Sequence, residues 1–279
     1  THRAYQADLR HFHEWGGTIP ADANMVAEYL AAHAEILAVP TLIRRLATIS
    51  KTHTLRGHES PTKANLVRTV MRGIKRTHGR QPQQKAAVLT EQIIAMVGNI
   101  GTRRKDMRDR ALLLVGFAGG FRRSELVALK CTDIEWAAEG IIINLRRSKC
   151  DQEGIGRQVV IPYGQGTCCP VRALGDWLSV SGIESGSIFR AVNRHGHTAD
   201  KALSPEAVAL VIKARAKAAG MDPRRYSGHS LRAGLATSAA AAGVASWKIR
   251  RQTGHASEAM LERYIRDGNR FNDNAAVGL

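Results

Sequence analysis

The chain has 279 residues, of which 41 are Lys or Arg and only 24 are Asp or Glu, so its formal charge is +17 at pH 7. This excess of positive charge favours a polyanionic partner, and the sequence has neither a run of about 18 apolar residues nor a signal-peptide pattern. We therefore expect no membrane association, and the length predicts two domains.

The first eighty residues predict a small helical domain. Apolar residues near the start recur at helical spacing and should form its first core face: Tyr5, Leu9, Phe12 and Trp15. Three further helices are predicted over 21–37, 40–57 and 61–79. Pro40 and Pro61 fit the first turns of two of them, because proline is tolerated where a helix begins.

The third and fourth predicted helices carry many cations. Those proposed to bind DNA are Arg44, Arg45, Lys51, Arg68, Arg72, Lys75 and Arg76. A basic helix face is just as often a solvated surface, and composition alone does not separate the two interpretations.

Residues 81–88 are polar, include Pro82 and lack helical periodicity until the next apolar run. This pattern predicts a linker that separates a domain over 1–80 from a larger one over 89–279.

The second domain is predicted to be mostly helical with one small sheet. Two runs rich in β-branched residues, 140–149 and 157–162, flank a turn-like stretch and predict an antiparallel hairpin. Helices are predicted over 89–99, 106–118, 169–180, 204–220, 229–243, 245–254 and 258–266. The expected fold class is mainly α with a small antiparallel β-hairpin.

Four strings in this domain carry the residues of greatest chemical interest. They are GGFRRSEL (119–126), RRSK (146–149), GHSLRAGLAT (228–237) and TGHASEAMLERYIR (253–266). The residues singled out in them are Arg122, Lys149, His229, Arg232, His255 and Tyr264.

Attack on a phosphodiester requires fixed cations and hydrogen-bond donors, because negative charge spreads over the non-bridging oxygens in the transition state. Arginine suits this need best, since its planar group stays charged and matches phosphate oxygens. Arg122 and Arg232 are the proposed phosphate clamp. His229 lies one helical turn before Arg232 and should share its face.

Tyr264 is the candidate nucleophile and His255 a candidate phosphate donor. An ordinary tyrosine, with a pKa near 10, needs a base or a cationic field to react at neutral pH. Each residue also has a plainer interpretation: Tyr264 as an interfacial aromatic, and His255 as a helix cap. Glu125 either supports an arginine or is simply an acid favoured at a helix N-terminus.

In order and spacing, these motifs resemble the tyrosine recombinase, or phage integrase, family. The resemblance is good from about Leu89 onward and loose over the first eighty residues, where the opening YxxDLxxFxxW fits. Alignment with the family pattern GLRxSEL favours Arg122 over Arg123. It also implies that Lys149 is a mobile general acid and that Tyr264 forms a 3′-phosphotyrosine link to DNA.

The resemblance further implies a SAM-like N-terminal domain that closes half of a clamp on double-stranded DNA carrying a recombination site. It implies a tetrameric synapse, possible accessory DNA-binding proteins, and a location in the prokaryotic cytoplasm. The tail over 267–279 either docks on a neighbouring protomer or is a frayed terminus.

We expect neither a metal nor a cofactor, because the sequence has no metal-ligand spacing and no phosphate-binding loop for ATP. Two other functions stay open. A type IB topoisomerase would use a similar site to relax one duplex, and a non-catalytic DNA-binding regulator could keep the fold.

Overall fold

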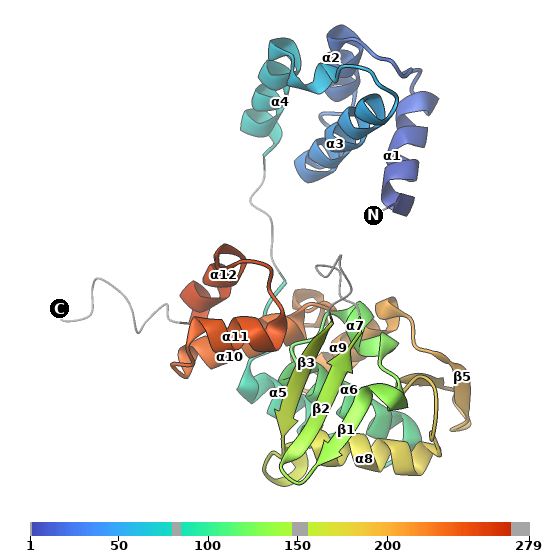
Figure 1. Ribbon diagram of the computed structural model, residues 1–279, viewed down its shortest axis with the longest axis vertical. Coiled ribbons are helices and arrows are strands. Elements are labelled where there is room, and N and C mark those ends of the chain that lie inside the picture. Colours follow the sequence, from blue (N-terminus) through green and yellow to red (C-terminus); the bar gives the residue numbers. More distant parts are fainter. Residues whose placement is uncertain (1, 80–84, 147–155, 269–279) are drawn as a thin grey trace, which may run out of the picture. The chain divides into compact units, whose positions relative to one another are not determined.

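The computed structural model describes residues 2–79, 85–146 and 156–268, and the chain divides into two compact units, 1–83 and 84–279 (Figure 1). Each unit has its own hydrophobic core. No helix in these described ranges is long and apolar enough to cross a membrane.

The first unit has four α-helices between residues 2 and 79. Its helices are α1 (His2–Glu14), α2 (Ala23–Ala32), α3 (Val39–Leu55) and α4 (Asn65–His78). Phe12, Tyr29 and Leu30 are among the fully buried residues of the core. Pro40 lies in the first turn of α3, as predicted.

Two helix boundaries differ from the predictions. Helix α2 ends at Ala32. The Nδ1 atom of His33 hydrogen-bonds the Tyr29 carbonyl at 2.8 Å, so the His33 side chain satisfies one of the last carbonyls of the helix. The helix predicted over 61–79 is divided into a 3-10 turn, Pro61–Lys63, and α4, because Ala64 between them adopts an extended backbone.

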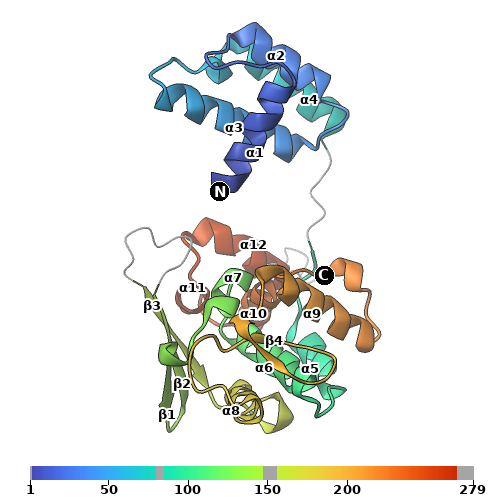
Figure 2. The ribbon, with the colours of Figure 1, turned by 90° about the vertical axis from the view of Figure 1, so that its right-hand side faces the viewer.

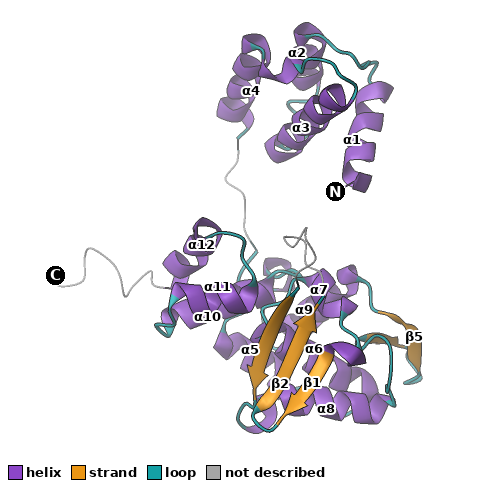
Figure 3. Cartoon of the chain, viewed as in Figure 1, coloured by secondary structure: helices purple, strands orange, loops and turns teal. Residues whose placement is uncertain are grey.

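Over its described residues the second unit is mostly helical, with two small antiparallel sheets (Figure 3). Its helices are α5 (Thr90–Gly98), α6 (Arg104–Ala118), α7 (Arg123–Ala128), α8 (Pro170–Ser181), α9 (Pro205–Ala218), α10 (Ser230–Ala241), α11 (Ser246–Thr253) and α12 (Glu258–Gly268). The strands are β1 (Ile134–Ala137), β2 (Gly140–Leu145) and β3 (Arg157–Pro162) in one sheet, and β4 (Arg190–Val192) and β5 (Thr198–Ala202) in the other.

The predicted hairpin is confirmed: β2 and β3 pair antiparallel, with Ile142 opposite Val160. Strand β1, which was not predicted, adds to the other side of β2. Ile141 and Ile143 of β2 point into the same core as Trp177 of α8, so the sheet covers one side of the helices. The second view of the ribbon shows this layer edge-on (Figure 2).

Part of the predicted linker belongs to the second unit. Residues 80–84 lie outside the described residues, but Val88 is fully buried and its N–H donates to the Ser230 carbonyl at 2.9 Å. The Ala86 N–H likewise donates to the Arg225 carbonyl at 2.7 Å. Within the predicted linker over 81–88, Ala86 and Val88 therefore contact the second unit, because the apolar Val88 side chain is buried in its core.

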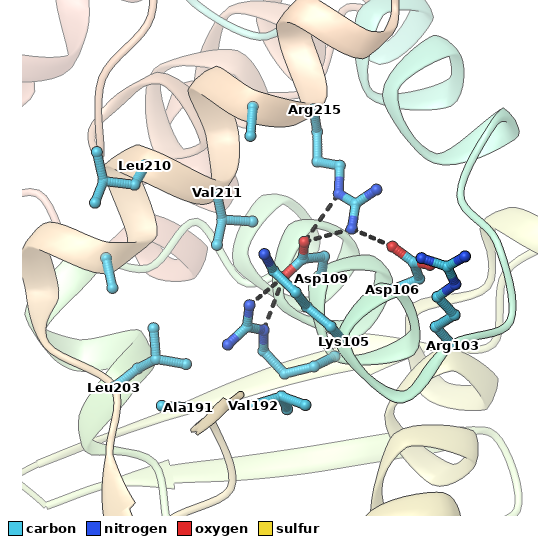
Figure 4. Close-up of a pocket in the computed structure, with 13 residues that line it drawn as sticks. Arg103, Lys105, Asp106, Asp109, Ala191, Val192, Leu203, Leu210, Val211 and Arg215 are labelled. Atoms are coloured by element: carbon cyan, nitrogen blue, oxygen red, sulfur yellow. Dashed lines mark hydrogen bonds and ion pairs between the residues drawn. The ribbon is translucent and has the colours of Figure 1, made fainter. Parts of the chain in front are cut away.

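A buried ion network joins α6 to α9. Asp109 accepts hydrogen bonds from Arg108 at 2.7 Å and from Arg215 at 2.6 Å, and Arg215 also reaches Asp106 at 2.5 Å. These groups line an open pocket of about 590 Å³ (Figure 4). The buried carboxylate of Asp109 is thus paired with two arginines, as the cost of burying a lone charge requires.

Candidate active site

The predicted catalytic residues within the described ranges come from the second unit. Arg122 is the residue before α7, His229 and Arg232 begin α10, His255 follows α11, and Tyr264 lies in α12. Helices α10, α11 and α12 pack against one another in both ribbon views (Figures 1 and 2). Residues far apart in sequence are thereby brought together.

The end of α11 is surrounded by three arginines. Arg157 donates to the Gln252 carbonyl at 2.5 Å, Arg232 donates to the Thr253 carbonyl, and Arg122 donates to the Gly254 carbonyl at 3.3 Å. The last carbonyls of a helix lack intrahelical partners and carry partial negative charge. Three consecutive carbonyls therefore orient three guanidinium groups toward one region.

Glu125 fixes two of these arginines. Its Oε1 pairs with Nη1 of Arg122 at 2.5 Å, while its Oε2 accepts from the Arg122 backbone N–H at 3.0 Å and from Nη2 of Arg157 at 3.2 Å. Glu125 is only 6% exposed. The sequence left two interpretations of Glu125, a support for an arginine and an acid at a helix N-terminus. The carboxylate does both, since it caps α7 and also pairs with the Arg122 side chain.

Arg122, rather than its neighbour Arg123, lies at this site. The Arg123 side chain is 44% exposed and faces Glu206, with a separation of 3.6 Å between Nη2 and Oε1. The Arg123 side chain also packs on Gly228, which leaves no room there for a Cβ. The two adjacent arginines therefore have different partners: Arg122 lies at the site, and Arg123 lies at the surface beside Glu206.

Arg232 is a buried cation. It is 5% exposed, and its Nη1 donates to the Gly120 carbonyl at 2.9 Å. Burial, followed by the neighbouring cation of Arg122, lowers the pKa of Arg232 to about 10. Arg232 thus stays charged at neutral pH, and a bound anion would stabilise this buried cation.

His255 is 7% exposed and held by Thr253. The Thr253 hydroxyl lies 2.7 Å from the Ile249 carbonyl and 2.7 Å from Nδ1 of His255. A hydroxyl has one proton and a carbonyl can only accept, so Thr253 donates to Ile249 and accepts from Nδ1–H of His255. The Nε2 atom is therefore the nitrogen left for another partner.

His255 is neutral at physiological pH. Burial, and then the cations of Arg232, Arg122 and Arg157, lower its pKa to about 4. The centroid of its ring is 5.6 Å from that of Tyr264, at a tilt of 42°. Gly254, between α11 and His255, has a φ of +66°, which glycine adopts without strain and which ends the helix.

Two predicted catalytic residues remain, His229 and Lys149. His229 is the N-cap residue of α10, one turn before buried Arg232, and its own side chain is exposed. Lys149 lies outside the described residues.

The predicted DNA-binding residues of the first unit do not form one group. Arg45 is 8% exposed and donates to the Tyr29 hydroxyl at 2.8 Å, while Arg44 makes two hydrogen bonds of 2.8 Å to Asp8. Arg45 is therefore part of the interior, which contradicts its prediction as a surface contact. The other predicted residues are exposed: Lys51, Arg68, Arg72, Lys75 and Arg76.

Sequence reasoning missed Arg157 and Thr253. Arg157 begins the predicted strand over 157–162, but nothing in its local pattern distinguishes it from other arginines. Thr253 directly precedes the Gly-His pair, which was its only signal. Among the described residues, no group of three or more His, Cys, Asp or Glu side chains could hold a metal ion.

A mostly helical unit that gathers arginines, a histidine and a tyrosine in this way has clear relatives. The model of the phage integrase family matches residues 87–270. Over 285 aligned positions the chain is 39% identical to an integrase/recombinase XerD homolog of Selenomonas ruminantium, covering 99% of this chain and 84% of the relative. It is 26% identical to the recombinase Cre of Escherichia phage P1, covering 89% and 77%.

Solved structures share the fold. The XerH site-specific recombinase bound to palindromic difH substrate aligns with a TM-score of 0.66 at 17% identity, covering 97% of this chain and 76% of that one. A Tn1549 transposon integrase in complex with transposon right end DNA aligns with a TM-score of 0.67 at 14% identity, covering 96% and 91%. The chain belongs to the phage integrase family and is a site-specific tyrosine recombinase, a DNA strand-exchange enzyme.

Proposed function

We propose that this recombinase cleaves DNA with Tyr264 as its nucleophile. As the Tyr264 hydroxyl gives up its proton, its oxygen attacks the phosphorus of one phosphodiester: a P–O bond to tyrosine forms, and the bond to the 5′ oxygen, which takes up a proton, breaks. The products are a 3′-phosphotyrosine and a free 5′ hydroxyl. A 5′ hydroxyl from a partner strand then reverses the attack and rejoins the DNA without an external energy source.

The observation that carries this proposal is the gathering of Arg122, Arg232 and His255 around the end of α11, with the Tyr264 ring 5.6 Å from that of His255. The two guanidinium groups supply positive charge where the non-bridging oxygens become more negative. Preorganised donors of this kind act at no reorganisation cost, and losing one typically lowers a rate about 100- to 1,000-fold.

His255 completes the proposed phosphate site. Because its Nδ1–H is held by Thr253, the Nε2 atom must take up a proton before it can donate to a phosphate oxygen. The negative charge of a bound phosphate offsets the nearby cations that disfavour this proton. Phosphate binding and proton uptake at His255 are therefore coupled in this proposal.

The departing 5′ oxygen needs a proton. Lys149 is proposed as its donor on the strength of the family resemblance, and His229, exposed one turn before Arg232, could share proton transfer.

Double-stranded DNA with a recombination site is the proposed partner, bound as a homo-oligomer that becomes tetrameric at synapsis. The relatives support this, since one solved structure is a lambda integrase dimer bound to a core site. The exposed cations of α4 give the first unit a surface suited to phosphate. We place the activity in the prokaryotic cytoplasm, with accessory DNA-binding proteins as possible partners.

The comparisons favour neither a type IB topoisomerase nor a non-catalytic regulator. A direct experiment separates these functions: supercoiled plasmid carrying the DNA that flanks the coding sequence is incubated with a labelled linear duplex of the same sequence. Transfer of label to the plasmid is the expected result. Relaxation without transfer would indicate a topoisomerase, and binding without either would indicate a regulator.

A further inference from the structure

Arg157 holds an unusual place beside the proposed catalytic groups. It begins β3, yet its side chain joins two other elements, α7 through Glu125 at 3.2 Å and the end of α11 through the Gln252 carbonyl at 2.5 Å. Its own side chain is largely buried. One cation therefore ties the sheet to both segments that present the site.

The contact with Glu125 bears on Arg122. Glu125 Oε2 accepts from Arg157 and from the Arg122 backbone, while Oε1 takes the Arg122 guanidinium. Two arginines thus share one carboxylate. Without Arg157, Glu125 would keep its bonds to Arg122 but lose its link to β3.

The contact with Gln252 bears on His255. Gln252, Thr253 and Gly254 are consecutive, and each offers its carbonyl to one arginine. A Cβ placed on Gly254 would lie 2.7 Å from Nε of Arg157, so the arginine packs directly over this glycine. The position of His255, the next residue, thus depends on the same packing.

We infer that Arg157 is a positioning residue for strand cleavage, which sets Arg122 through Glu125 and His255 through the end of α11. This inference rests on the proposed cleavage by Tyr264. Arg157 need not touch DNA in this role. Its removal should slow chemistry while leaving affinity for DNA unchanged.

The main test is single-turnover cleavage by Arg157→Met, which keeps the aliphatic stem and removes the charged group. The substrate is a nicked form of the duplex on which the wild-type protein forms its adduct, so that the cleaved strand cannot rejoin. We expect the cleavage rate to fall about 100-fold, the usual effect of a small misplacement of reacting groups. The dissociation constant for the same duplex should stay within about twofold, since the removed guanidinium does not bind phosphate in this account.

The matched control is Gln158→Met. Gln158 is the next residue of β3, is exposed, and bonds across the sheet to Asn144 at 2.9 Å. The Gln158→Met variant should cleave at the wild-type rate. Arg157→Lys keeps a cation and one donor but cannot bridge both partners, so its rate should lie between those of wild type and Arg157→Met. Should Arg157→Met fail to fold, the lysine variant carries the test alone, and an unchanged rate there would overturn the inference.

A double-mutant cycle separates positioning from a general loss of stability. If Arg157 acts through Glu125, the rate of Arg157→Met with Glu125→Gln should be much faster than the product of the two single losses predicts. If the rate loss of the double variant instead equals the product of the two single losses, Arg157 does not act through Glu125.

A further readout needs no DNA. Because the Arg157 cation helps to lower the pKa of His255, an NMR titration of the His255 ring should show a higher pKa in Arg157→Met and the wild-type value in Gln158→Met. An unmoved value overturns the inference. Wild-type cleavage with an unaffected Arg157→Met variant also overturns it, whereas no adduct on Tyr264 in wild type removes the proposed function and this inference together.

Discussion

Glu125 holds Arg122 at two points, through the guanidinium at 2.5 Å and through the backbone N–H at 3.0 Å. The arginine and its own helix N-terminus are therefore fixed by the same carboxylate. A side chain held in this way has lost its rotamer freedom before substrate arrives. Catalysis benefits from such preorganisation, because no free energy is then spent on ordering the group during the reaction.

Adjacent arginines should behave differently on substitution. Arg122→Lys removes the planar group and should lower the single-turnover cleavage rate about 100- to 1,000-fold, the usual cost of one missing donor. Arg123→Lys is the matched control and should be near wild type, because Arg123 faces Glu206 at the surface. Comparable losses in both variants would mean that the wrong arginine has been assigned to the phosphate.

Stability should fall on acidification through His255. Its pKa is near 6.5 in the unfolded chain and about 4 in the folded protein, so the unfolded state binds more protons between these values. The contribution is complete above pH 6.5 and is lost as the pH falls toward 4, by about 3 kcal/mol in total. Urea unfolding at several pH values should show this dependence and its reduction in His255→Asn.

Asparagine is chosen there because its amide can still donate to Thr253. The exposed residue His58 supplies the control, and His58→Asn should keep the wild-type pH dependence. His11, whose pKa is also lowered by burial, contributes in both proteins and cancels in the comparison. An unchanged slope in His255→Asn would show that His255 is not buried as a neutral ring.

The ion network of α6 and α9 should be important for folding. Asp109→Ala leaves Arg108 and Arg215 without their shared carboxylate, and breaking a buried pair typically costs about 3–5 kcal/mol. Thermal and urea unfolding should reveal this destabilisation. Asp200→Ala, which removes a fully exposed carboxylate 3.9 Å from Arg190, should have no measurable effect. Equal stabilities of the two variants would contradict a buried network.

The exposed cations of α4 should contribute to DNA affinity. Replacing Arg68, Arg72, Lys75 and Arg76 by Gln should weaken binding and flatten the dependence of log K on log salt by about 0.9 for each phosphate that is no longer neutralised. Arg224→Gln is the control, because this exposed arginine is already paired with Asp222 at 3.1 Å. An unchanged salt slope in the variant with all four substitutions would show that α4 does not contact DNA.

Much of the fold could be predicted from local pattern. The hairpin of β2 and β3 followed from two β-branched runs around a turn, and Pro40 marked the start of α3. Strand β1 could not be predicted in this way, since its four residues acquire their structure by pairing with β2. Val88 was assigned to a linker because its partner, the Ser230 carbonyl, lies far along the chain.

The site was predictable only where residues repeat a familiar motif. In the sequence Arg45 resembles any exposed cation, but its side chain is buried because it donates to the Tyr29 hydroxyl of another helix. Arg157 was missed for the converse reason, because its partners Glu125 and Gln252 are more than thirty residues away on either side. Long-range partners of this kind decide which arginines of a basic chain become parts of a site.

The most direct measurement is to mix the protein with plasmid carrying its native flanking DNA in excess chelator, denature the mixture with detergent, and map covalent adducts by mass spectrometry. Nicked duplexes of the same sequence are run in parallel so that religation cannot hide the intermediate. We expect a nucleotide attached to Tyr264, through its 3′ phosphate, in the wild-type protein and none in Tyr264→Phe. An adduct on another residue, or tight DNA binding with no adduct on either substrate, would contradict it.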